Sequence, residues 1–530
     1  TALGGSGTVG GQPGWDMHGM VNVPLVEERV GMRAVAYHDH EGGYITNLAV
    51  GQDSNAVNVT GGRLALSARI GDSSRVDAGV LYQATNGNDA PYVRGDAGPL
   101  RRRAMIAEPY ASKLVLGYLT FERAWDSGVK LTSVTSLGSR SSFDVFDSTP
   151  RPTAAPVAYQ IDRGSTMFAQ EIRLARRSDG GLSWVAGMTY QRARDGLTRS
   201  LGMPEEPTEL DEVTNTTYAA SLFGQATLSL GSGVSATLGL RWTAARTDSE
   251  PSRDTRALIR GVDTRRTDPT AALAWRVAPH GLLYARVQTS YRNGGMAVER
   301  GVGRVANFAA DSIVMGEAGV RRLRSGTRGL SASMAVSYTH WADIQADLIT
   351  RRGLPFTANI GNARIVAVEA TADWVAARGL TVGGSLLHTD SRISGPLPDQ
   401  TAPRDRRLPE TPLWSGAARV SYAWGRPASE GAGLNRAVGT SHRIGAALRY
   451  VGRSILGPGT LINASQGDYM VADLQGGIRR GSMDMSLAVE NLFNTRANLF
   501  AFGNPVSFAA RDQSVPLRPL TVRVTVGVDW

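Results

Sequence analysis

Apolar and polar side chains alternate one by one along many segments of this chain. In the last segment, Val522, Val524 and Val526 share one side of an extended backbone. Arg523 and Thr525 fall on the other side. The same alternation is present at 234–242, 283–291, 332–339, 443–450 and 483–490. Because successive side chains of a strand point to opposite faces, this pattern predicts many β-strands, each with one apolar and one polar face.

The predicted strands are long for a soluble protein. They run to roughly 9–14 residues, whereas soluble strands average ~5–6 and a tilted strand crosses a bilayer in ~9–11. Aromatic residues stand near the ends of the apolar faces, as expected at a membrane interface. These are Trp242, Tyr291, Tyr338, Tyr450 and Trp530. The sequence therefore predicts an all-β fold, a transmembrane antiparallel up-and-down β-barrel.

Counting the segments up and down gives about 22 strands, a size at which the lumen needs a plug. We place them near 1–8, 14–24, 30–42, 61–70, 75–84, 111–125, 128–142, 166–178, 181–194, 216–230, 233–246, 268–278, 281–291, 312–325, 329–342, 356–375, 379–390, 411–425, 440–453, 466–480, 482–494 and 515–530.

The connections between these segments fall into two length classes. Short ones include Val26–Val30, Ser178–Gly181, Gly231–Gly233, Ala278–Gly281, Ser325–Gly329, Ala376–Gly379 and Arg480–Ser482. Long ones are near 85–110, 143–165, 195–215, 247–267, 292–311, 343–356, 391–410, 426–440 and 495–514. This asymmetry predicts short periplasmic turns and long extracellular loops.

Composition is compatible with such a barrel and excludes several other classes. The 530 residues include 42% hydrophobic ones, yet no apolar run approaches the ~18 residues of a membrane helix. The mean hydropathy of −0.18 fits a wall whose apolar half alternates with a polar half. There is no cysteine, so neither a disulfide nor a thiolate is available.

The charge balance is basic and is supplied by arginine. The formal net charge is +10, and Lys113 and Lys130 are the only lysines. Arginine suits phosphate and carboxylate, so nucleic acid, lipopolysaccharide phosphates and an anionic ligand are candidate partners. A GC-rich genome would produce the same bias. The basic residues are scattered rather than gathered in one tract, which argues against nucleic acid.

Enzyme motifs are absent or out of context. The stretch Gly5–Gly10 matches G-x-G-x-x-G, but a turn at Gly11–Gly14 follows it where a dinucleotide site needs a helix. No G-x-S-x-G elbow and no phosphate-binding P-loop occurs. The chain starts without a signal peptide. We expect no catalytic residue, no cofactor and no enzyme activity.

Several segments, taken in order, resemble the barrel of TonB-dependent outer-membrane receptors. The resemblance rests on Met20–Leu25 with Met32–Tyr37 and Gly42–Ile45; Gln170–Leu174 with Trp184–Gly187; Leu283–Arg286 with Tyr291–Gly295; Asn359–Ala363 leading to Val368 and Glu369, with Ala367 where the family usually has Gly; Glu490–Asn494; and Leu517–Leu520.

The resemblance implies a receptor that takes up a scarce ligand, such as a siderophore–iron complex or another large nutrient, across the outer membrane of a Gram-negative cell. It implies a plug domain, the TonB energy-coupling complex acting through that plug, and the barrel-assembly machinery, for which Trp530 matches the terminal aromatic signal. We expect residues 1–530 to be the barrel domain, with the plug and TonB box outside this sequence. Outer-membrane lipid and lipopolysaccharide are further expected partners.

Three alternatives stay open at this point. The first is a passive channel without a plug, which bilayer conductance would reveal. The second is an outer-membrane enzyme, for which no Ser/His/Asp set has usable spacing. The third is a large soluble β-protein, which would need no detergent.

Arginine clusters on the predicted long loops are the candidate contacts for a small-molecule or metal-chelate ligand. They are Arg101, Arg102, Arg103, Arg256, Arg260, Arg265, Arg266, Arg351, Arg352, Arg404, Arg406 and Arg407. Solvated loops and contacts with lipopolysaccharide phosphates are the alternative interpretations of the same clusters, and they are favoured for any single cluster. His38 and His40 share one face of a strand and are weak metal candidates, with a polar rim as the alternative. We otherwise expect no metal site.

Overall fold

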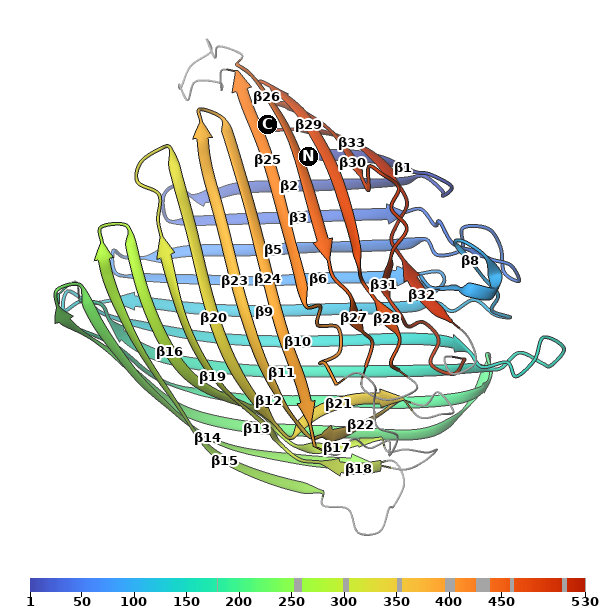
Figure 1. The fold of residues 1–530 in the computed structure, drawn as a ribbon. Helices are drawn as coiled ribbons and strands as arrows, with labels where there is room; N and C mark the ends of the chain where they lie inside the picture. Colours follow the sequence, from blue (N-terminus) through green and yellow to red (C-terminus); the bar gives the residue numbers. More distant parts are fainter. Residues whose placement is uncertain are drawn as a thin grey trace.

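One antiparallel sheet of 22 strands forms nearly the whole molecule, seen as a tapered barrel in Figure 1. The computed structural model describes residues 1–178, 180–251, 260–298, 305–349, 355–395, 406–425, 439–457, 462–507 and 512–529. Each barrel strand pairs with the next one along the chain, and the first pairs with the last, so that Ala2 lies opposite Gly527. This pairing leaves the sheet without a free edge, as a membrane-spanning sheet requires.

Each of the 22 predicted segments overlaps one barrel strand, although several bounds differ. The barrel strands are β1 (Ala2–Thr8), β2 (Gly14–Val26), β3 (Val30–Glu41), β5 (Val57–Ile70), β6 (Ser74–Gly87), β9 (Tyr110–Ala124), β10 (Val129–Asp147), β11 (Ala158–Arg176), β12 (Leu182–Met203), β13 (Glu206–Gly231), β14 (Val234–Pro251), β15 (Gly261–Ala278), β16 (Gly281–Arg292), β19 (Asp311–Arg322), β20 (Gly329–Ala342), β23 (Asn362–Ala377), β24 (Leu380–Ser394), β25 (Trp414–Gly425), β26 (Thr440–Val451), β29 (Tyr469–Arg480), β30 (Met483–Glu490) and β33 (Thr521–Val528).

Short strands in the long connections complete the fold. They are β4 (Thr46–Asn47), β7 (Val93–Arg94), β8 (Arg101–Arg102), β17 (Gly295–Val298), β18 (Val305–Phe308), β21 (Ile344–Ile349), β22 (Pro355–Ile360), β27 (Ser454–Ile455), β28 (Ser465–Gln466), β31 (Asn498–Phe500) and β32 (Gln513–Pro516). A single 3-10 turn, Gly95–Ala97, is the helical structure of the described residues. No helix among those residues has the length and apolar character needed to cross a membrane.

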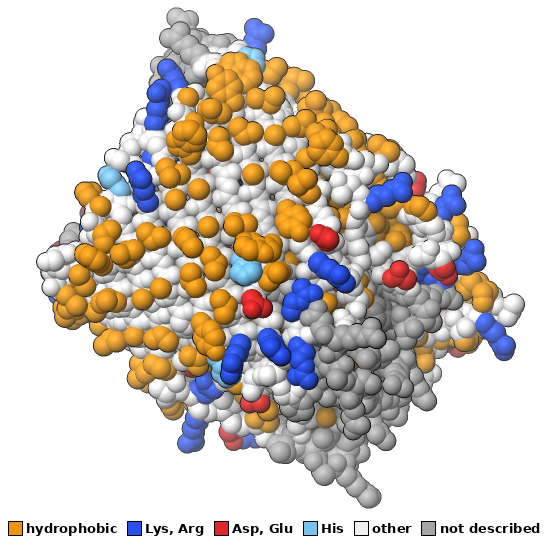
Figure 2. All heavy atoms as spheres, viewed as in Figure 1, with side chains coloured by type: hydrophobic (Ala, Val, Ile, Leu, Met, Phe, Trp, Pro, Cys, Tyr) orange, Lys and Arg blue, Asp and Glu red, His pale blue; other side chains and the backbone are white. Residues whose placement is uncertain are grey.

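The outer face of the wall is apolar and open. Leu238, Leu240 and Trp242 of β14 all lie on this face and are exposed, as are Val522 and Val524 of β33. Figure 2 shows such hydrophobic side chains spread over the outside of the strands. An apolar surface of this extent is far larger than a soluble protein normally exposes. It confirms the predicted alternation, with an apolar face on the outside of the barrel.

The lumenal face carries charges that pair between neighbouring strands or across one intervening strand. Arg443 donates two hydrogen bonds to Asp484, at 2.8 and 2.6 Å. Arg286 contacts Glu317 at 3.0 Å, and Arg523 contacts Asp16 at 3.0 Å. Such cross-strand pairs are the sheet's equivalent of helix salt bridges. Most of these wall arginines therefore balance wall acids.

The structure differs from the predicted strands and connections at three places. The segment 195–215 is not an open loop, because β12 and β13 continue as a long hairpin that pairs to Met203 and Glu206. The predicted strand 356–375 is divided at Gly361, where β22 leaves the wall to pair with β21.

The third difference is that one long connection lies at the opposite end of the barrel from the one predicted. The 426–440 connection joins β25 to β26 at the end that has the short turns, although its length suggested an extracellular loop. Residues 426–438 lie outside the described residues. At the other end, the connection between β26 and β29 is the long one that the prediction missed.

The long connections fold together over that end of the barrel and form a hydrophobic cluster, which we call the loop cap. It comprises Ile344, Leu348, Phe356, Ile360, Ala363, Ile393, Leu408, Leu456, Ile462 and Ala501. These residues come from four consecutive long connections and the strand ends beside them. Burial of apolar area holds the cap together, since its members share no continuous sheet.

Candidate functional site

A cavity of about 1010 Å³ lies between the barrel wall and the loop cap, and we call it the cap cavity. Binding pockets for small ligands commonly measure ~300–1,000 Å³, so this one suits a large ligand. Its wall comes from β9 to β13 and its cover from β17, β18, β21, β22 and the later loops. The cavity therefore joins strands early in the chain to loops almost 400 residues away, since its lining runs from Tyr110 to Phe502.

The wall of the cap cavity is charged. Arg140 and Asp144 of β10 lie on the strand face opposite the exposed Leu137. Arg163 of β11 donates to Asp144 at 3.0 Å, and Asp195 of β12 lies beside them in the lining. Asp347 and Glu410 from the loops also line the cavity. The described lining thus contains two arginines and four carboxylates, an excess of two negative charges.

The cover of the cap cavity is apolar and aromatic. Met296, Val298 and Phe308 line it from β17 and β18. The loop cap contributes Leu348, Phe356, Leu456 and Ile462, and the side chains packed against it contribute Ile349, Phe500 and Phe502. A ligand here would meet charges on one side and aromatic rings on the other. This pairing of surfaces suits an amphipathic molecule.

Arg102, one of the predicted ligand contacts, is completely buried. Its guanidinium forms ion pairs with Asp89 and Glu108, which are themselves buried, and it lies 4.6 Å from the ring centre of Tyr92. No ligand in the cavity can reach this charge. Burial therefore gives Arg102 a structural role that its place in the Arg101–Arg103 run did not suggest.

The acids around Arg102 are bound from several loops, and we call the set the arginine knot. Asp89 accepts from Ser54 Oγ at 2.6 Å and from Asn47 Nδ2 at 3.2 Å. Asn504 donates to Glu108 Oε1 at 2.7 Å from the last loop. Burial raises the pKa of Glu108 above its usual range, although Arg102 opposes this shift. The knot thus ties together loops almost 460 residues apart in sequence.

None of the described arginines predicted as ligand contacts lines the cap cavity. Arg101 and Arg103 are exposed beside the knot, and Arg260 and Arg265 are exposed near the start of β15. Arg266 lies 3.5 Å from Asp268 and 5.0 Å from the ring centre of Tyr291.

Arg406 accepts a hydrogen bond from the Ile393 amide through its carbonyl, and Arg407 donates to the Arg453 carbonyl at 3.5 Å. Arg256, Arg351, Arg352, Arg404 and the assembly candidate Trp530 lie outside the described residues. For the exposed and undescribed arginines, ligand contact stays a prediction.

The predicted histidine pair faces outward rather than into the lumen. His38 bonds Thr60 at 2.7 Å, His40 bonds Asn58 at 2.8 Å, and Trp15 stacks on both rings. No third ligand accompanies them among the described residues. The two imidazoles therefore behave as part of an aromatic rim.

A different histidine lies among carboxylates. His18 Nε2 is 2.9 Å from Asp39 and 3.5 Å from Asp16, on the lumenal face of β2 and β3. These three side chains could hold a cation. Asp16 already receives a hydrogen bond from Arg523, however, which competes with a metal. Sequence spacing alone missed this group, because Asp16 and Asp39 meet only through the hairpin register.

The closed 22-strand barrel with an apolar outer wall and a capped lumenal cavity has the architecture of the large outer-membrane transporters. Residues 42–492 match the family described as TonB dependent receptor-like, beta-barrel. The chain belongs to this family, so it is the barrel of a TonB-dependent receptor. The family implies a plug, TonB and a ligand as partners, and its members are receptors and transporters.

Solved structures share the whole barrel. The ferric yersiniabactin uptake receptor FyuA from Yersinia pestis has a TM-score of 0.81 and 17% identity, covering 100% of this chain and 79% of that one. The siderophore receptor PiuA from Acinetobacter baumannii has a TM-score of 0.76 and 12% identity, covering 100% and 81%. The copper transporter OprC has a TM-score of 0.72 and 15% identity, covering 100% and 80%. No curated protein sequence matches the chain.

Proposed function

We propose that this receptor takes up a neutral or cationic amphipathic ligand, such as a metal chelate with aromatic groups, and that the cap cavity is its binding site. The observation that carries the proposal is the contrast between the two surfaces of the cavity. Carboxylates outnumber arginines by two in the whole lining, because Asp347 and Glu410 of the loops add to a balanced wall, and aromatic side chains gather on the cover. The ligands named for FyuA, PiuA and OprC show that metal uptake is common on this fold.

The charge of the cavity argues against a carboxylate-rich chelate. Arg163 is already paired with Asp144, which leaves Arg140 as the one lining arginine without an ion pair among the described residues. Asp195, Asp347 and Glu410 have no arginine or lysine partner there. A polyanion entering this space would meet an excess of like charges, which is unfavourable. A cation or a hydrogen-bond donor would be stabilised.

The experiment measures affinity for probes that share one aromatic scaffold and differ in charge. The receptor, purified in detergent, is titrated calorimetrically with ferric chelates of phenolate ligands bearing net positive, zero or negative charge. The expected order of affinity is positive, then neutral, then negative. An anionic probe that binds most tightly would overturn the proposal.

A charge variant tests whether the cavity itself sets this order. Asp195→Asn should weaken the cationic probe about ten-fold, since a hydrogen bond to a charged group is worth ~1.5 kcal/mol or more. Glu369→Gln is the matched control, because Glu369 lies on β23 and is not part of the cavity lining. Equal losses in both variants would place the effect outside the cavity.

We propose further partners from the character of the wall. Its apolar outer face supports residence in the outer membrane among lipid and lipopolysaccharide, and the family supports insertion by the barrel-assembly machinery. We also propose that the plug and TonB box belong to the lumen-filling part of the receptor, outside residues 1–530. Uptake of this kind involves no covalent chemistry, so we assign no enzyme activity.

A further inference from the structure

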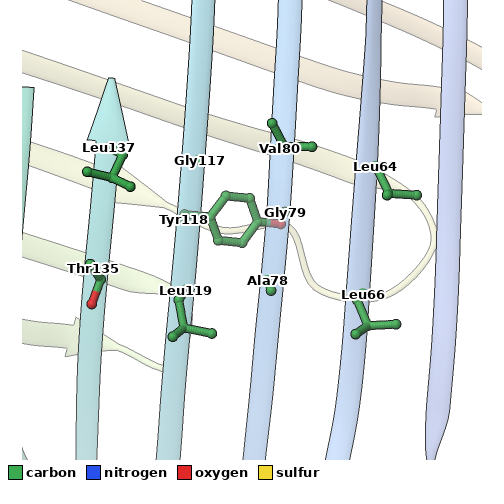
Figure 3. A pocket seen from close by; sticks show the side chains of 10 residues that line it. All are labelled: Leu64, Leu66, Ala78, Gly79, Val80, Gly117, Tyr118, Leu119, Thr135 and Leu137. Carbon is green, nitrogen blue, oxygen red and sulfur yellow. The ribbon is translucent and has the colours of Figure 1, made fainter. Parts of the chain in front are cut away.

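A shallow apolar hollow lies on the outer wall over β5, β6, β9 and β10. It measures about 400 Å³ and is lined by Leu64, Leu66, Val80, Leu119 and Leu137 among others (Figure 3). The hollow exists because Gly117 has no side chain between Val80 and Leu137, its partners on the neighbouring strands. It is therefore a notch in the wall and not part of the lumen.

A second hollow of about 550 Å³ continues the first along the wall. The two share Val80, Gly117 and Leu137. The second extends over β11 to Phe168 and ends at Arg192 and Arg194 of β12. One register row of the sheet runs from Gly117 through Leu137 and Phe168 to Arg192. We call the joined hollows the outer groove.

The two arginines at the end of the outer groove stand on the outer face. Both are exposed, and they alternate with the lumenal Asp195 and Gln191 of the same strand. Arg192 lies 5.7 Å from the ring centre of Tyr218, and neither guanidinium forms an ion pair among the described residues. Charges of one sign thus remain uncompensated beside an apolar groove.

The position of this pair along β12 matters for what can bind. The strand runs from the short-turn end at Leu182 toward the loop end at Met203. An apolar band ~25 Å tall covers about ten residues of a tilted strand, which places Arg192 and Arg194 near its outer boundary. A ligand with an acyl chain in the groove would hold its polar head beside them.

We propose that the outer groove is a binding site for a phosphorylated glycolipid of the outer leaflet, of the lipid A type, with an acyl chain along Gly117 and a phosphate at Arg192 and Arg194. Guanidinium groups bind phosphate through charge-assisted, often bidentate hydrogen bonds. The acyl chain removes apolar side chains of the groove from contact with other lipids. Charge complementarity and the apolar lining together select an anionic amphiphile.

Native mass spectrometry of the delipidated receptor tests the site. The probes are bis-phosphorylated lipid A, the same lipid with both phosphates removed, and phosphatidylglycerol. The unaltered receptor should retain phosphorylated lipid A at least ten-fold more tightly than the dephosphorylated form. The double variant R192Q/R194Q should lose this preference. Gly117→Phe should weaken both forms of lipid A, since a Cβ at Gly117 has its nearest neighbour 4.0 Å away and a ring would fill the groove.

The control is Arg246→Gln, which removes an outward arginine of β14 that is already paired with Asp248 at 2.8 Å. It should leave lipid binding unchanged. An equal loss in this variant would show a general charge effect and overturn the site. Equal retention of dephosphorylated lipid A, or of phosphatidylglycerol, would overturn the assignment to a phosphorylated glycolipid. Heat-dependent gel migration confirms in each case that the barrel is folded.

Discussion

Two groups of arginine and carboxylate at the loop end of the barrel have the same chemistry and opposite uses. In the arginine knot, Arg102 is fully buried between Asp89 and Glu108. In the cap cavity, Arg163 meets Asp144 at 3.0 Å, but about half of the arginine side chain and a third of the carboxylate remain exposed. The first pair holds loops together, whereas the second stays open to a ligand.

Burial is what separates the two groups. A charge taken out of water needs hydrogen-bond and ion-pair partners, and the knot supplies most of them from loops far apart in sequence. A pair that stays in contact with water contributes little to stability, so its side chains can exchange partners at small cost. The knot therefore stabilises the arrangement of the loops, whereas the Arg163–Asp144 pair is available to contact a ligand.

Arg102→Met should have the largest effect on stability. It leaves two buried carboxylates without a counter-charge, at a cost of about 3–5 kcal/mol to the loop assembly. Limited proteolysis should then cleave loops 88–109 and 491–520, while the barrel strands stay intact. Arg101→Met, which changes an exposed neighbouring residue, is the control. Its loops should be cleaved no faster than those of the unaltered protein. Equal cleavage of both variants would contradict the knot.

The stability of the Arg102→Met variant should increase as the pH falls. Burial already raises the pKa of Glu108, and loss of Arg102 raises it further. A carboxyl whose pKa is raised by folding adds stability below its unfolded pKa of ~4.3, and this contribution is lost as pH rises through the folded pKa. Arg102→Met should therefore recover part of its lost stability at pH 5 relative to pH 8. Thermal unfolding followed by near-ultraviolet circular dichroism checks this, with the unaltered protein measured at each pH.

Ile393→Ala should rank next, because it tests the apolar part of the loop cap instead of the charged part. Ile393 is fully buried in the cap, so its truncation should cost about 2–5 kcal/mol. Limited proteolysis should then cleave the cap connections 343–361 and 395–413 but spare the knot loop 88–109. Ile444→Ala, on the exposed outer wall, is the control and should leave the loops closed. Opening of both loop groups together would show that cap and knot form one unit.

Arg163→Gln should have the smallest effect on stability, below about 1 kcal/mol, because the pair is partly exposed. It frees Asp144, so the affinity for a cationic probe should rise a few-fold, opposite in sign to Asp195→Asn. Arg173→Gln is a close match, since Arg173 and Glu171 form a 3.1 Å pair of similar exposure on the same strand outside the cavity. Calorimetry distinguishes the two. A weaker cationic probe in Arg163→Gln would contradict the charge assignment.

The strands were predictable because their cause is local. Each segment carries its own alternation of apolar and polar residues, as in Val522, Val524 and Val526. This local pattern is sufficient to predict a strand with one apolar and one polar face. The 426–440 connection was predicted to be an extracellular loop because it is long. Counting the directions of the strands would have placed it at the short-turn end. The hairpin of β12 and β13 was missed because its outer part, from Asp195 to Asp211, is rich in glycine, proline and charged residues, a composition typical of a loop.

The site was less predictable because it depends on contacts between distant segments. Loop arginines were the natural candidates, yet the described cavity takes Arg140 and Arg163 from strands. Nothing in the run Arg101–Arg103 indicates that its middle member alone meets Asp89 and Glu108. His18 and Asp39 likewise meet only when the register of β2 and β3 is known.

The amino-acid sequence alone determined that this chain forms a large barrel with an oily outside and a polar inside, and which family it resembles. Those properties follow from side chains two residues apart. Only the tertiary structure decided which charges are buried, which are open and where a cavity lies. The reason is physical: desolvation and partner geometry depend on neighbours that the closed sheet and its folded loops bring together from across the whole chain.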